Sequence, residues 1–462
     1  MTLSLPKRLQ PLISRFVQSV IPDAPITWEN LILVVSVTLL PLFYLTVKNW
    51  TETWLVILAV ISGYEIWKSR LPLKSLFPDR ATSWIFGALS FPILAVFLSI
   101  LLRGDIHWKL LAQNIDLLNG PSRLLLAGVA FLWMNYRKVR FMDAFNIACS
   151  ISIILTWPFA TAQQPGLPDR YTTSLIDLDE FSQQICALGL LQFAFLVFRP
   201  PSSRMVLALN IIAVLIASKL AISSGGRGGW IAIPPVLLVI SFLYKGPKLR
   251  LLAGMLVIIL AAAMLIALNK SFRERSLSIY SQTTAWFEGS NDPLSGGSGR
   301  LSMWTISWQL IKQKPIVGYG SKLNFWDPVY HMDPSLYLRK GVAYETEESI
   351  RYCLCDVGEH NQYLSDYLLN GFSGFLSRLG IFIIPLIIFI RVRNRGDEAY
   401  SAACIGICFI CSFVIFGITQ GPFSYKFISS FYGFMIAALV AQSLSTHYAK
   451  THRTTPDAFE AR

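Results

Sequence analysis

The sequence predicts an all-α, polytopic integral membrane protein with about 12 transmembrane helices. Hydrophobic residues make up 53% of the 462 residues, and the mean hydropathy is +0.50. Soluble domains contain about 45–50% apolar residues even when glycine is counted. Apolar stretches of roughly 17 to 25 residues recur between Leu31 and Thr446, and a helix of that length crosses the ~30 Å hydrocarbon core of a bilayer. Stretches of this length exclude a transmembrane β-barrel, whose strands need only about 10 residues.

The predicted spans fall into two groups on either side of a long segment without apolar periodicity. Nine spans lie within residues 1–268, and three spans with a cytoplasmic tail lie within residues 372–462. The expected spans are near residues 31–48, 53–67, 83–102, 122–136, 141–162, 181–198, 204–222, 228–244, 249–268, 372–390, 399–418 and 427–446.

Basic residues precede the first span and follow every even-numbered span. By the positive-inside rule, both termini are therefore expected in the cytoplasm and the odd-numbered connections outside. The formal net charge of +13 follows largely from this topology, and no nucleic-acid partner is needed to explain it. The basic residues are Lys7, Arg8, Arg15, Lys68, Arg70, Lys74, Arg80, Arg137, Lys138, Arg140, Arg199, Arg204, Lys245, Lys248, Arg250, Arg391, Arg393, Arg395, Lys450 and Arg453.

Residues 269–371 are expected to form a large outward loop. A connection of roughly one hundred residues is far longer than usual and is either functional or disordered. The loop carries several tryptophans, and disordered segments have few aromatic residues. Its stretch "RLSMWTISWQLIKQKPIVGYG" predicts a helix that ends at Pro315, and "GEHNQYLSDYLLNGF" predicts the start of a second helix. The loop is therefore the extramembrane unit that is large enough to form a site together with the ends of the spans.

The stretch "ISSGGRGGW" places the cation Arg227 among glycines, with no acidic residue nearby in sequence. One interpretation is a cation that caps the end of a span or extends toward lipid headgroups. The other is an anion site, because flanking glycines let main-chain N–H groups and the guanidinium approach one phosphate. The sequence favours neither.

Two more residues of the loop are candidates for chemistry. Arg300 lies in the first turn of a predicted helix, where a cation opposes the helix dipole unless an anion is bound there; a solvated loop arginine is the alternative. His360, one of five histidines, opens a helix between Glu359 and Asn361. A neutral imidazole there can accept a proton from a hydroxyl nucleophile, although a surface histidine at a helix start is the simpler interpretation.

The acidic stretch "DLDE" contains Asp177, Asp179 and Glu180 at the outward start of a span. Such acids can hold Mg²⁺ or Mn²⁺ beside a diphosphate. They also stabilise a helix N-terminus through the helix dipole, which is the interpretation we prefer. No metal and no cofactor are therefore expected.

Three motifs together resemble the O-antigen ligase and polymerase superfamily of membrane glycosyltransferases. They are "SSGGRGGW", "GRLSMWTISWQLIKQKPIVGYG" and "EHNQYLSDYLLNG", in the order and topological setting that the family shows. The resemblance implies a GT-C-like fold and transfer of a polysaccharide from undecaprenyl diphosphate to an acceptor sugar, at the periplasmic face of the inner membrane. Arg227 and Arg300 would bind the diphosphate, and His360 would orient or deprotonate the acceptor hydroxyl. Further residues expected to contact substrate are Gly226, Gly228, Trp304, Tyr319, Glu359, Asn361 and Tyr363.

Several activities remain open within this resemblance. A ligase that joins O-antigen to lipid A-core is favoured over a polymerase that joins lipid-linked repeat units, because the compact loop and the fit of all three motifs are more ligase-like. The expected transfer is metal-independent and inverts the anomeric configuration. The non-enzyme alternative is a flippase or transporter for lipid-linked oligosaccharides, for which Pro92, Pro234 and Pro235 would mark broken helices.

Overall fold

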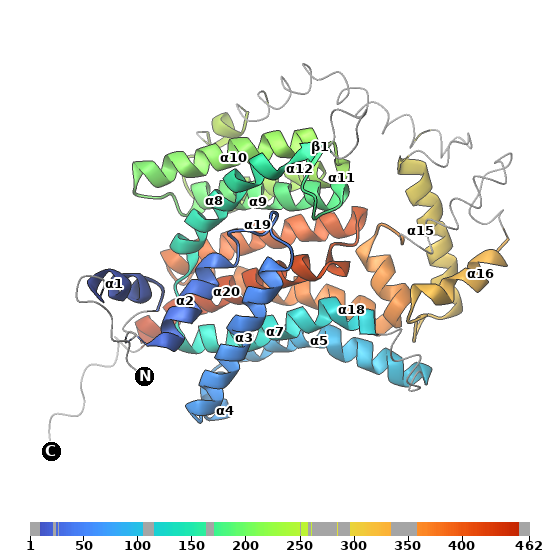
Figure 1. Cartoon of the computed structure of the whole chain (residues 1–462), viewed down its shortest axis with the longest axis horizontal. Coiled ribbons are helices and arrows are strands. Elements are labelled where there is room, and N and C mark those ends of the chain that lie inside the picture. Colours follow the sequence, from blue (N-terminus) through green and yellow to red (C-terminus); the bar gives the residue numbers. More distant parts are fainter. Residues whose placement is uncertain are drawn as a thin grey trace.

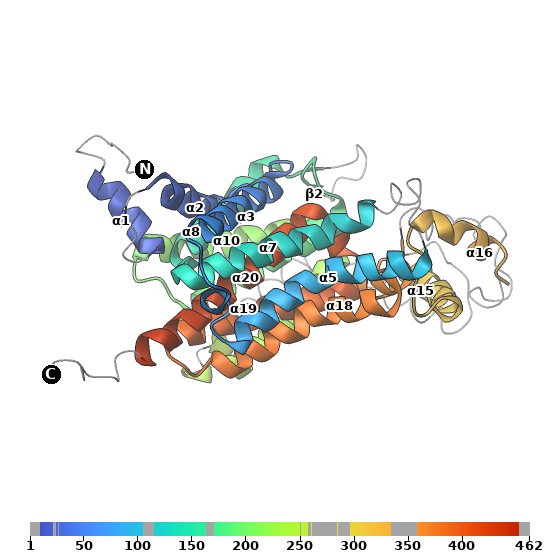
Figure 2. The ribbon, with the colours of Figure 1, turned by 90° about the horizontal axis from the view of Figure 1, so that it is seen from below.

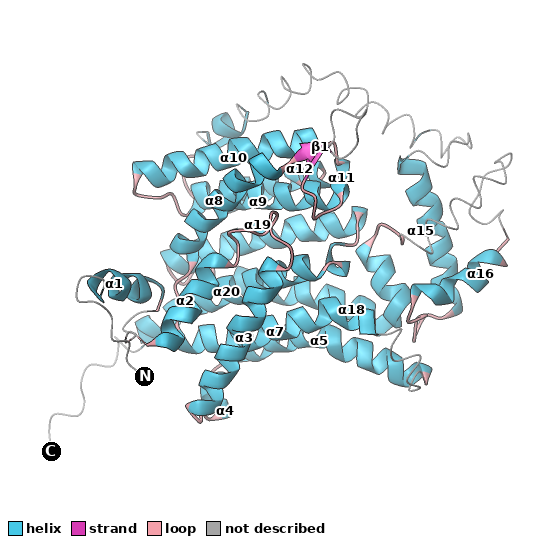
Figure 3. Ribbon diagram, in the orientation of Figure 1, coloured by secondary structure: helices cyan, strands magenta, loops and turns pink. Residues whose placement is uncertain are grey.

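The computed structural model describes residues 10–21, 25, 27–104, 115–162, 171–249, 251–256, 260, 284, 296–333 and 358–451. Within these residues nearly all regular structure is helical (Figure 3). The exception is an antiparallel pair of two-residue strands, β1 (Thr161–Ala162) and β2 (Tyr171–Thr172). The predominance of helix agrees with the predicted fold class.

Seven helices in the described part of the chain are long and apolar enough to cross a membrane. Each coincides with a predicted span, so a polytopic membrane protein is confirmed, whereas the count of 12 spans is not. The helices are α5 (Arg80–Arg103), α8 (Met142–Phe159), α9 (Leu178–Phe198), α10 (Arg204–Ser224), α18 (Gln362–Val392), α19 (Asp397–Thr419) and α20 (Lys426–Thr451), of which Lys426–Ser445 is the apolar part.

The remaining elements are shorter or less apolar. The predicted spans near 53–67 and 122–136 are helical, as α3 and α7. These elements are α1 (Gln10–Val20), α2 (Trp28–Leu39), α3 (Trp50–Lys68), α4 (Leu73–Leu76), η1 (Ile115–Leu118), α7 (Asn119–Arg137), α11 (Arg227–Trp230), α12 (Ile233–Leu243), α15 (Gly296–Gln313), η2 (Lys322–Phe325), α16 (Trp326–Tyr330) and η4 (Pro422–Ser424).

Two predicted spans are not continuous helices. The span near 31–48 is helical only to Leu39, and turns follow, because Pro41 has no N–H to continue the helical ladder. The span near 228–244 is divided into the short α11 and α12, with Pro234 in the first turn of α12, a position that proline tolerates. The span near 249–268 lies mostly outside the described residues.

Helix α20 lies in the core of the bundle, where it contacts α3, α7, α18 and α19. Its Tyr432 is fully buried and packs against Phe413 of α19 at 5.0 Å and Phe423 at 4.9 Å between ring centroids. By contrast, α10 exposes large apolar side chains such as Leu215, which is 64% exposed. Apolar side chains on the outside and in the core suit a bundle that is surrounded by lipid.

The bundle has two distinct ends (Figures 1 and 2). Helices α15 and α16 lie at one end, and α1 and the red C-terminal end of α20 lie at the other. The two described extremities of the chain thus share one side of the bundle. That this side is the cytoplasmic one stays a prediction.

A break in α18 fixes the position of α15. Gly371 has φ 63° and ψ −158°, which divides α18 into a first segment, 362–370, and a longer second one. A β-carbon at Gly371 would lie 2.0 Å from the carbonyl oxygen of Ile316, far inside van der Waals contact. Glycine is therefore required here both by the backbone angle and by the close approach of the loop after α15.

The loop after α15 bonds directly to the main chain of α18 at this break. Tyr319 N–H donates to the carbonyl of Leu368 at 2.6 Å, and Gly320 N–H donates to that of Leu369 at 2.8 Å. In return, Phe372 N–H donates to the carbonyl of Pro315 at 3.0 Å. The "PIVGYG" motif thus supplies the hydrogen-bond partners that a broken helix leaves unmatched.

Replacing Gly371 by alanine should destabilise the protein. The backbone conformation of Gly371, φ 63° and ψ −158°, is essentially restricted to glycine and costs a residue with a β-carbon about 1–3 kcal/mol, and the contact with Ile316 adds to this. The unfolding midpoint of the detergent-purified protein measures the effect. Gly87→Ala is the control, because nothing lies within 4 Å of the added carbon on that helix face; equal midpoints for the two variants would contradict the assigned constraint.

Candidate active site

A chain of hydrogen bonds holds the imidazole of His360. His360 Nδ1 bonds to Oε1 of Gln420, and Nε2 of Gln420 donates to Oε1 of Glu180. Gln420 follows the end of α19, and Glu180 lies in the first turn of α9. Because the amide nitrogen of Gln420 donates to the carboxylate, its oxygen is the group that faces His360, and an amide oxygen can only accept. The proton of the neutral imidazole therefore resides on Nδ1, and Nε2 is left as an acceptor.

The backbone around His360 is fixed at the start of α18. His360 has φ 47°, a left-handed conformation that is uncommon for residues other than glycine. Asn361 then caps the helix, since its Oδ1 accepts from the N–H groups of Tyr363 at 3.0 Å and Leu364 at 3.2 Å. Gln362 N–H donates to the carbonyl of Gln420 at 3.1 Å. Asn361 thus caps α18 and also lines the cavity beside His360, and its contact with substrate stays a prediction.

A polar cavity of about 140 Å³ adjoins His360. Typical pockets for small molecules measure about 300–1,000 Å³, so this cavity fits only the reacting part of a larger substrate. It lies between the start of α18, the start of α9 and the segment that joins α19 to α20. Its lining residues are Glu180, Lys322, Gly358, Glu359, His360, Asn361, Ser365, Gln420, Gly421, Ser424 and Tyr425.

Glu359 contributes a buried carboxyl group to this cavity. It is 2% exposed, and its Oε1 has no hydrogen-bond partner among the residues that the structure describes. Burial raises the pKa of Glu359, and the positive charge of Lys322 acts in the opposite direction. The main-chain carbonyl of Glu359 accepts from Nε1 of Trp304 at 2.9 Å. Trp304 therefore holds the Glu359 backbone from α15, and the orphaned carboxyl oxygen is a ready partner for a substrate hydroxyl.

Arg300 is paired with Asp179 rather than solvated alone. Arg300 Nη2 lies 2.8 Å from Asp179 Oδ2, and the side chains are 26% and 35% exposed. Burial lowers the pKa of His360, its bond to Gln420 opposes this, and the positive charge of Arg300 lowers the pKa further. Arg300 thus acts on the imidazole, as expected for residues of one site. Because exposed ion pairs contribute little stability, Asp179 can be exchanged for another anion.

The acids of "DLDE" have individual partners. Asp177 is the N-cap residue of α9, yet its side chain makes no capping bond and accepts from the Tyr425 hydroxyl at 3.1 Å. Burial and the charges of Glu180 and Asp177 raise the pKa of Tyr425, so this hydroxyl stays protonated. Asp179 and Glu180 lie in the first turn of α9, the position that the dipole interpretation requires, and each of the three acids also has a side-chain partner. Within the described residues no three histidine, cysteine or acidic side chains are arranged to hold a metal ion.

The glycines around Arg227 serve close packing. A β-carbon at Gly226 would lie 2.4 Å from Cβ of Ser182 on α9, and one at Gly228 would lie 2.9 Å from Oγ1 of Thr419 on α19. The Ser182 hydroxyl also donates to the carbonyl of Gly226 at 2.5 Å. Thr419 directly precedes Gln420, so α11 lies at the corner of the bundle that holds His360. Substrate contact by Gly226 and Gly228 stays a prediction.

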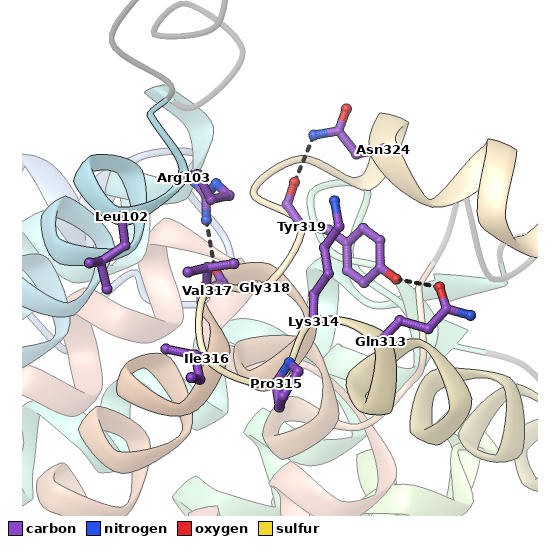
Figure 4. Close-up of a pocket in the computed structure, with 10 residues that line it drawn as sticks. All are labelled: Leu102, Arg103, Gln313, Lys314, Pro315, Ile316, Val317, Gly318, Tyr319 and Asn324. Carbon is purple, nitrogen blue, oxygen red and sulfur yellow. Dashed lines mark hydrogen bonds between the residues drawn. The ribbon is translucent and has the colours of Figure 1, made fainter.

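The structure separates some of the predicted residues from the cavity. The described residues that line it include neither Arg227 nor Arg300. Tyr319 is buried, and its hydroxyl donates to Gln313 Oε1 at 3.0 Å, beside a second pocket (Figure 4). Tyr363 donates to the carbonyl of Val414 at 2.8 Å and thereby joins α18 to α19. The geometry gives these two tyrosines structural contacts and offers no support for their substrate roles.

Three residues of the cavity carry no signal in the sequence. Gln420 and Tyr425 lie about 60 residues after His360 in an ordinary connection between two helices, and Lys322 lies in the short η2. Periodicity and motif spacing describe neighbours along the chain, and these residues meet His360 only through the packing of α9, α18 and α19.

The helical bundle and the polar cavity at one of its ends define a polytopic membrane protein with a candidate site at one end of the bundle. Residues 211–379, which include Arg227, Arg300 and His360, match the family model described as O-antigen ligase. This match confirms the resemblance to the O-antigen ligase family that the motifs indicated. A Haemophilus influenzae protein described as "Uncharacterized protein" is 25% identical over 408 residues, which cover 85% of this chain and 94% of that protein.

Two arginine–aspartate pairs, Arg300–Asp179 and Arg378–Asp366, should differ in their effect on stability. Asp179→Asn should change the free energy of unfolding by less than about 1 kcal/mol, because its partner is solvent-accessible. Asp366→Asn should cost about 3–5 kcal/mol, because it leaves Arg378, whose side chain is 5% exposed, without the carboxylate 2.6 Å away. Denaturant unfolding in detergent measures both. A large loss of unfolding free energy in Asp179→Asn would show that the ion pair with Arg300 stabilises the fold and is not easily broken.

Proposed function

We propose that the chain is an O-antigen ligase that transfers O-antigen polysaccharide from undecaprenyl diphosphate to a sugar hydroxyl of lipid A-core. The family supports a membrane enzyme of the O-antigen ligase or polymerase type; the donor and acceptor are part of the proposal. The observation that carries it is the imidazole of His360, which Gln420 orients beside a polar cavity. The loop 269–371 would bear the catalytic helices between the membrane parts 1–268 and 372–462.

The proposed reaction is a single displacement. The acceptor hydroxyl oxygen attacks the anomeric carbon of the donor's first sugar, and Nε2 of His360 accepts the hydroxyl proton. The bond between that carbon and the diphosphate oxygen breaks, and undecaprenyl diphosphate leaves with the bonding electrons. Attack opposite the leaving group inverts the anomeric configuration. A positioned general base typically contributes about 10²–10⁴-fold in rate.

The arginines would supply the countercharge for the diphosphate. The donor's phosphates would displace Asp179 from Arg300, at little cost because that pair is partly exposed. Arg227 begins α11, which contacts α9 and α19 at the corner that holds Gln420 and Glu180. Two fixed cations stabilise the negative charge that develops on the leaving group, so the proposed transfer needs no metal or cofactor. The site would face the periplasm from the bacterial inner membrane, with both termini cytoplasmic.

Complementation of a deletion strain tests this function. His360→Ala should produce lipopolysaccharide with no O-antigen on its core, while long lipid-linked polymer accumulates, because transfer stops after polymer assembly. Gel electrophoresis of lipopolysaccharide shows both features. Core that bears a single repeat unit would instead identify a polymerase. Donor that stays unassembled on the cytoplasmic face would identify a flippase.

Matched variants make this experiment specific. His331→Ala removes an exposed histidine that bonds only within its own helical turn in the described structure and should behave as wild type. Arg227→Ala and Arg300→Ala should lose transfer while remaining inserted in the membrane. Near-normal transfer in either arginine variant would remove that residue from the proposed mechanism.

The pH dependence of transfer reports the state of His360. A general base must be neutral, and burial lowers the pKa of His360 below its ordinary value of 6.5. Activity should therefore decrease as the pH is lowered, and the midpoint of this decrease should lie below about pH 6.5. In the exchanged variant Glu180→Gln/Gln420→Glu, a carboxylate would contact Nδ1 directly and favour the imidazolium, so the midpoint should rise by about 1 unit.

The exchange keeps one carboxylate and one amide in the same space, which limits the structural disturbance. Purified enzyme with lipid-linked donor and acceptor gives the rate at each pH. An acid limb with the same midpoint in both proteins would show that Gln420 and Glu180 do not position His360.

A further inference from the structure

A second pocket in the described part of the chain lies away from His360 and is larger than the cavity beside it. It measures about 570 Å³, within the range of about 300–1,000 Å³ that is usual for bound small molecules. It is formed by the C-terminal end of α5, the C-terminal end of α15 and the loop that follows (Figure 4). None of its described lining residues lines the cavity of His360.

The described residues that line this pocket include two cations. They are Arg103 and Lys314, and none of the described lining residues is acidic. Arg103 Nη1 donates to the carbonyls of Val317 at 2.9 Å and Leu369 at 3.2 Å, which holds the cation in place. Lys314 is exposed, and its Nζ lies 4.7 Å from the ring centroid of Tyr319. An anion in this pocket would meet two cations.

Neutral donors and a fixed loop complete the polar side of the pocket. Asn324 Nδ2 donates to the carbonyl of Tyr319 at 2.6 Å, and Figure 4 shows Asn324 and the Lys314 ammonium on the same side of the loop. Gly320 has φ 76°, and a β-carbon there would lie 2.8 Å from the Arg103 guanidinium. Glycine at this position therefore lets the loop approach Arg103.

Apolar side chains beside the pocket extend from a membrane-spanning helix. Leu101 and Leu102 in the last turn of α5 are 63% and 55% exposed, and Ile316 in the loop is 67% exposed. Helix α5 is long and apolar enough to cross the bilayer and ends at Arg103. Basic residues at the ends of membrane helices lie at the level of the lipid headgroups. The pocket therefore opens where hydrocarbon meets headgroups.

We propose that this pocket binds the phosphate-bearing headgroup of a membrane lipid, with the lipid chains along Leu101, Leu102 and Ile316. The phosphate lies between Arg103 and Lys314, and Asn324 donates to its oxygens. Arg300 lies in α15, and Lys314 directly follows the end of this helix, 14 residues further along the chain. Fourteen residues of helix span about 20 Å. This site is separate from the proposed diphosphate site, and its existence does not depend on transfer activity.

Lipid binding to the purified protein tests the proposal. Native mass spectrometry in detergent gives the affinity for phosphatidylglycerol and for lipid A as two phosphate-bearing probes. Lys314→Glu should weaken the binding of at least one probe tenfold or more, and Lys314→Arg should restore it. Lys312→Glu is the matched control, because Lys312 is exposed on the same helix end but does not line the pocket.

The two probes distinguish the source of the phosphate. Tenfold tighter binding of lipid A, lost in Lys314→Glu, identifies a phosphorylated glycolipid as the ligand, and equal Lys314-dependent binding of both identifies phospholipid of the surrounding bilayer. Wild-type affinity of Lys314→Glu for both probes would overturn the proposal. His360→Ala should keep the lipid affinity, so a failure of this site and a failure of the transfer mechanism give different results.

Discussion

The left-handed break at Gly371 is the constraint on which the site depends. It stops the first segment of α18 after residues 362–370 and leaves the carbonyls of Leu368 and Leu369 to be matched by the loop after α15. Helix α15 is thereby joined to the membrane helix α18 through main-chain hydrogen bonds, which do not depend on the identity of the side chains involved. The first segment of α18 follows His360, and α15 carries Arg300. Both candidate groups therefore take their places from a single interruption in a helix.

Two arginine–aspartate pairs near the site differ in burial: Arg378–Asp366 is buried, and Arg300–Asp179 is partly exposed. Asp366 binds Arg378 through two hydrogen bonds, and the guanidinium also lies 4.0 Å from the ring centroid of Phe423. This buried pair joins the two segments of α18 across the break and stacks on the segment that follows α19. The pair of Arg300 and Asp179 is partly exposed, at 26% and 35%. A buried ion pair beside a partly exposed one suits a site whose ligand arrives with its own negative charge.

Much of the architecture was predictable from the sequence, because lipid imposes long apolar helices whose length can be counted. Seven helices of the described region coincide with predicted spans, and the motifs correctly indicated the family. The wrong predictions have local causes: Pro41 ends a helix early, and Pro234 begins a new helix instead of continuing one.

In the site, His360, Glu359 and Asn361 could be predicted because they are adjacent in one motif. Gln420, Tyr425 and Lys322 could not, since only tertiary packing brings them to His360. The glycines beside Arg227 invited a ligand interpretation, whereas the helices α9 and α19 occupy the space beside them.

The small volume of the cavity beside His360 limits which part of a polymeric substrate can contact the site. A space of about 140 Å³ encloses a reacting centre and leaves the remainder of any polymer outside it. Under the proposed function, a glycan of three repeats and one of thirty present the same first sugar to the same imidazole. Selection of polymer length would then belong to whatever assembles the donor, and this protein would attach long and short chains alike.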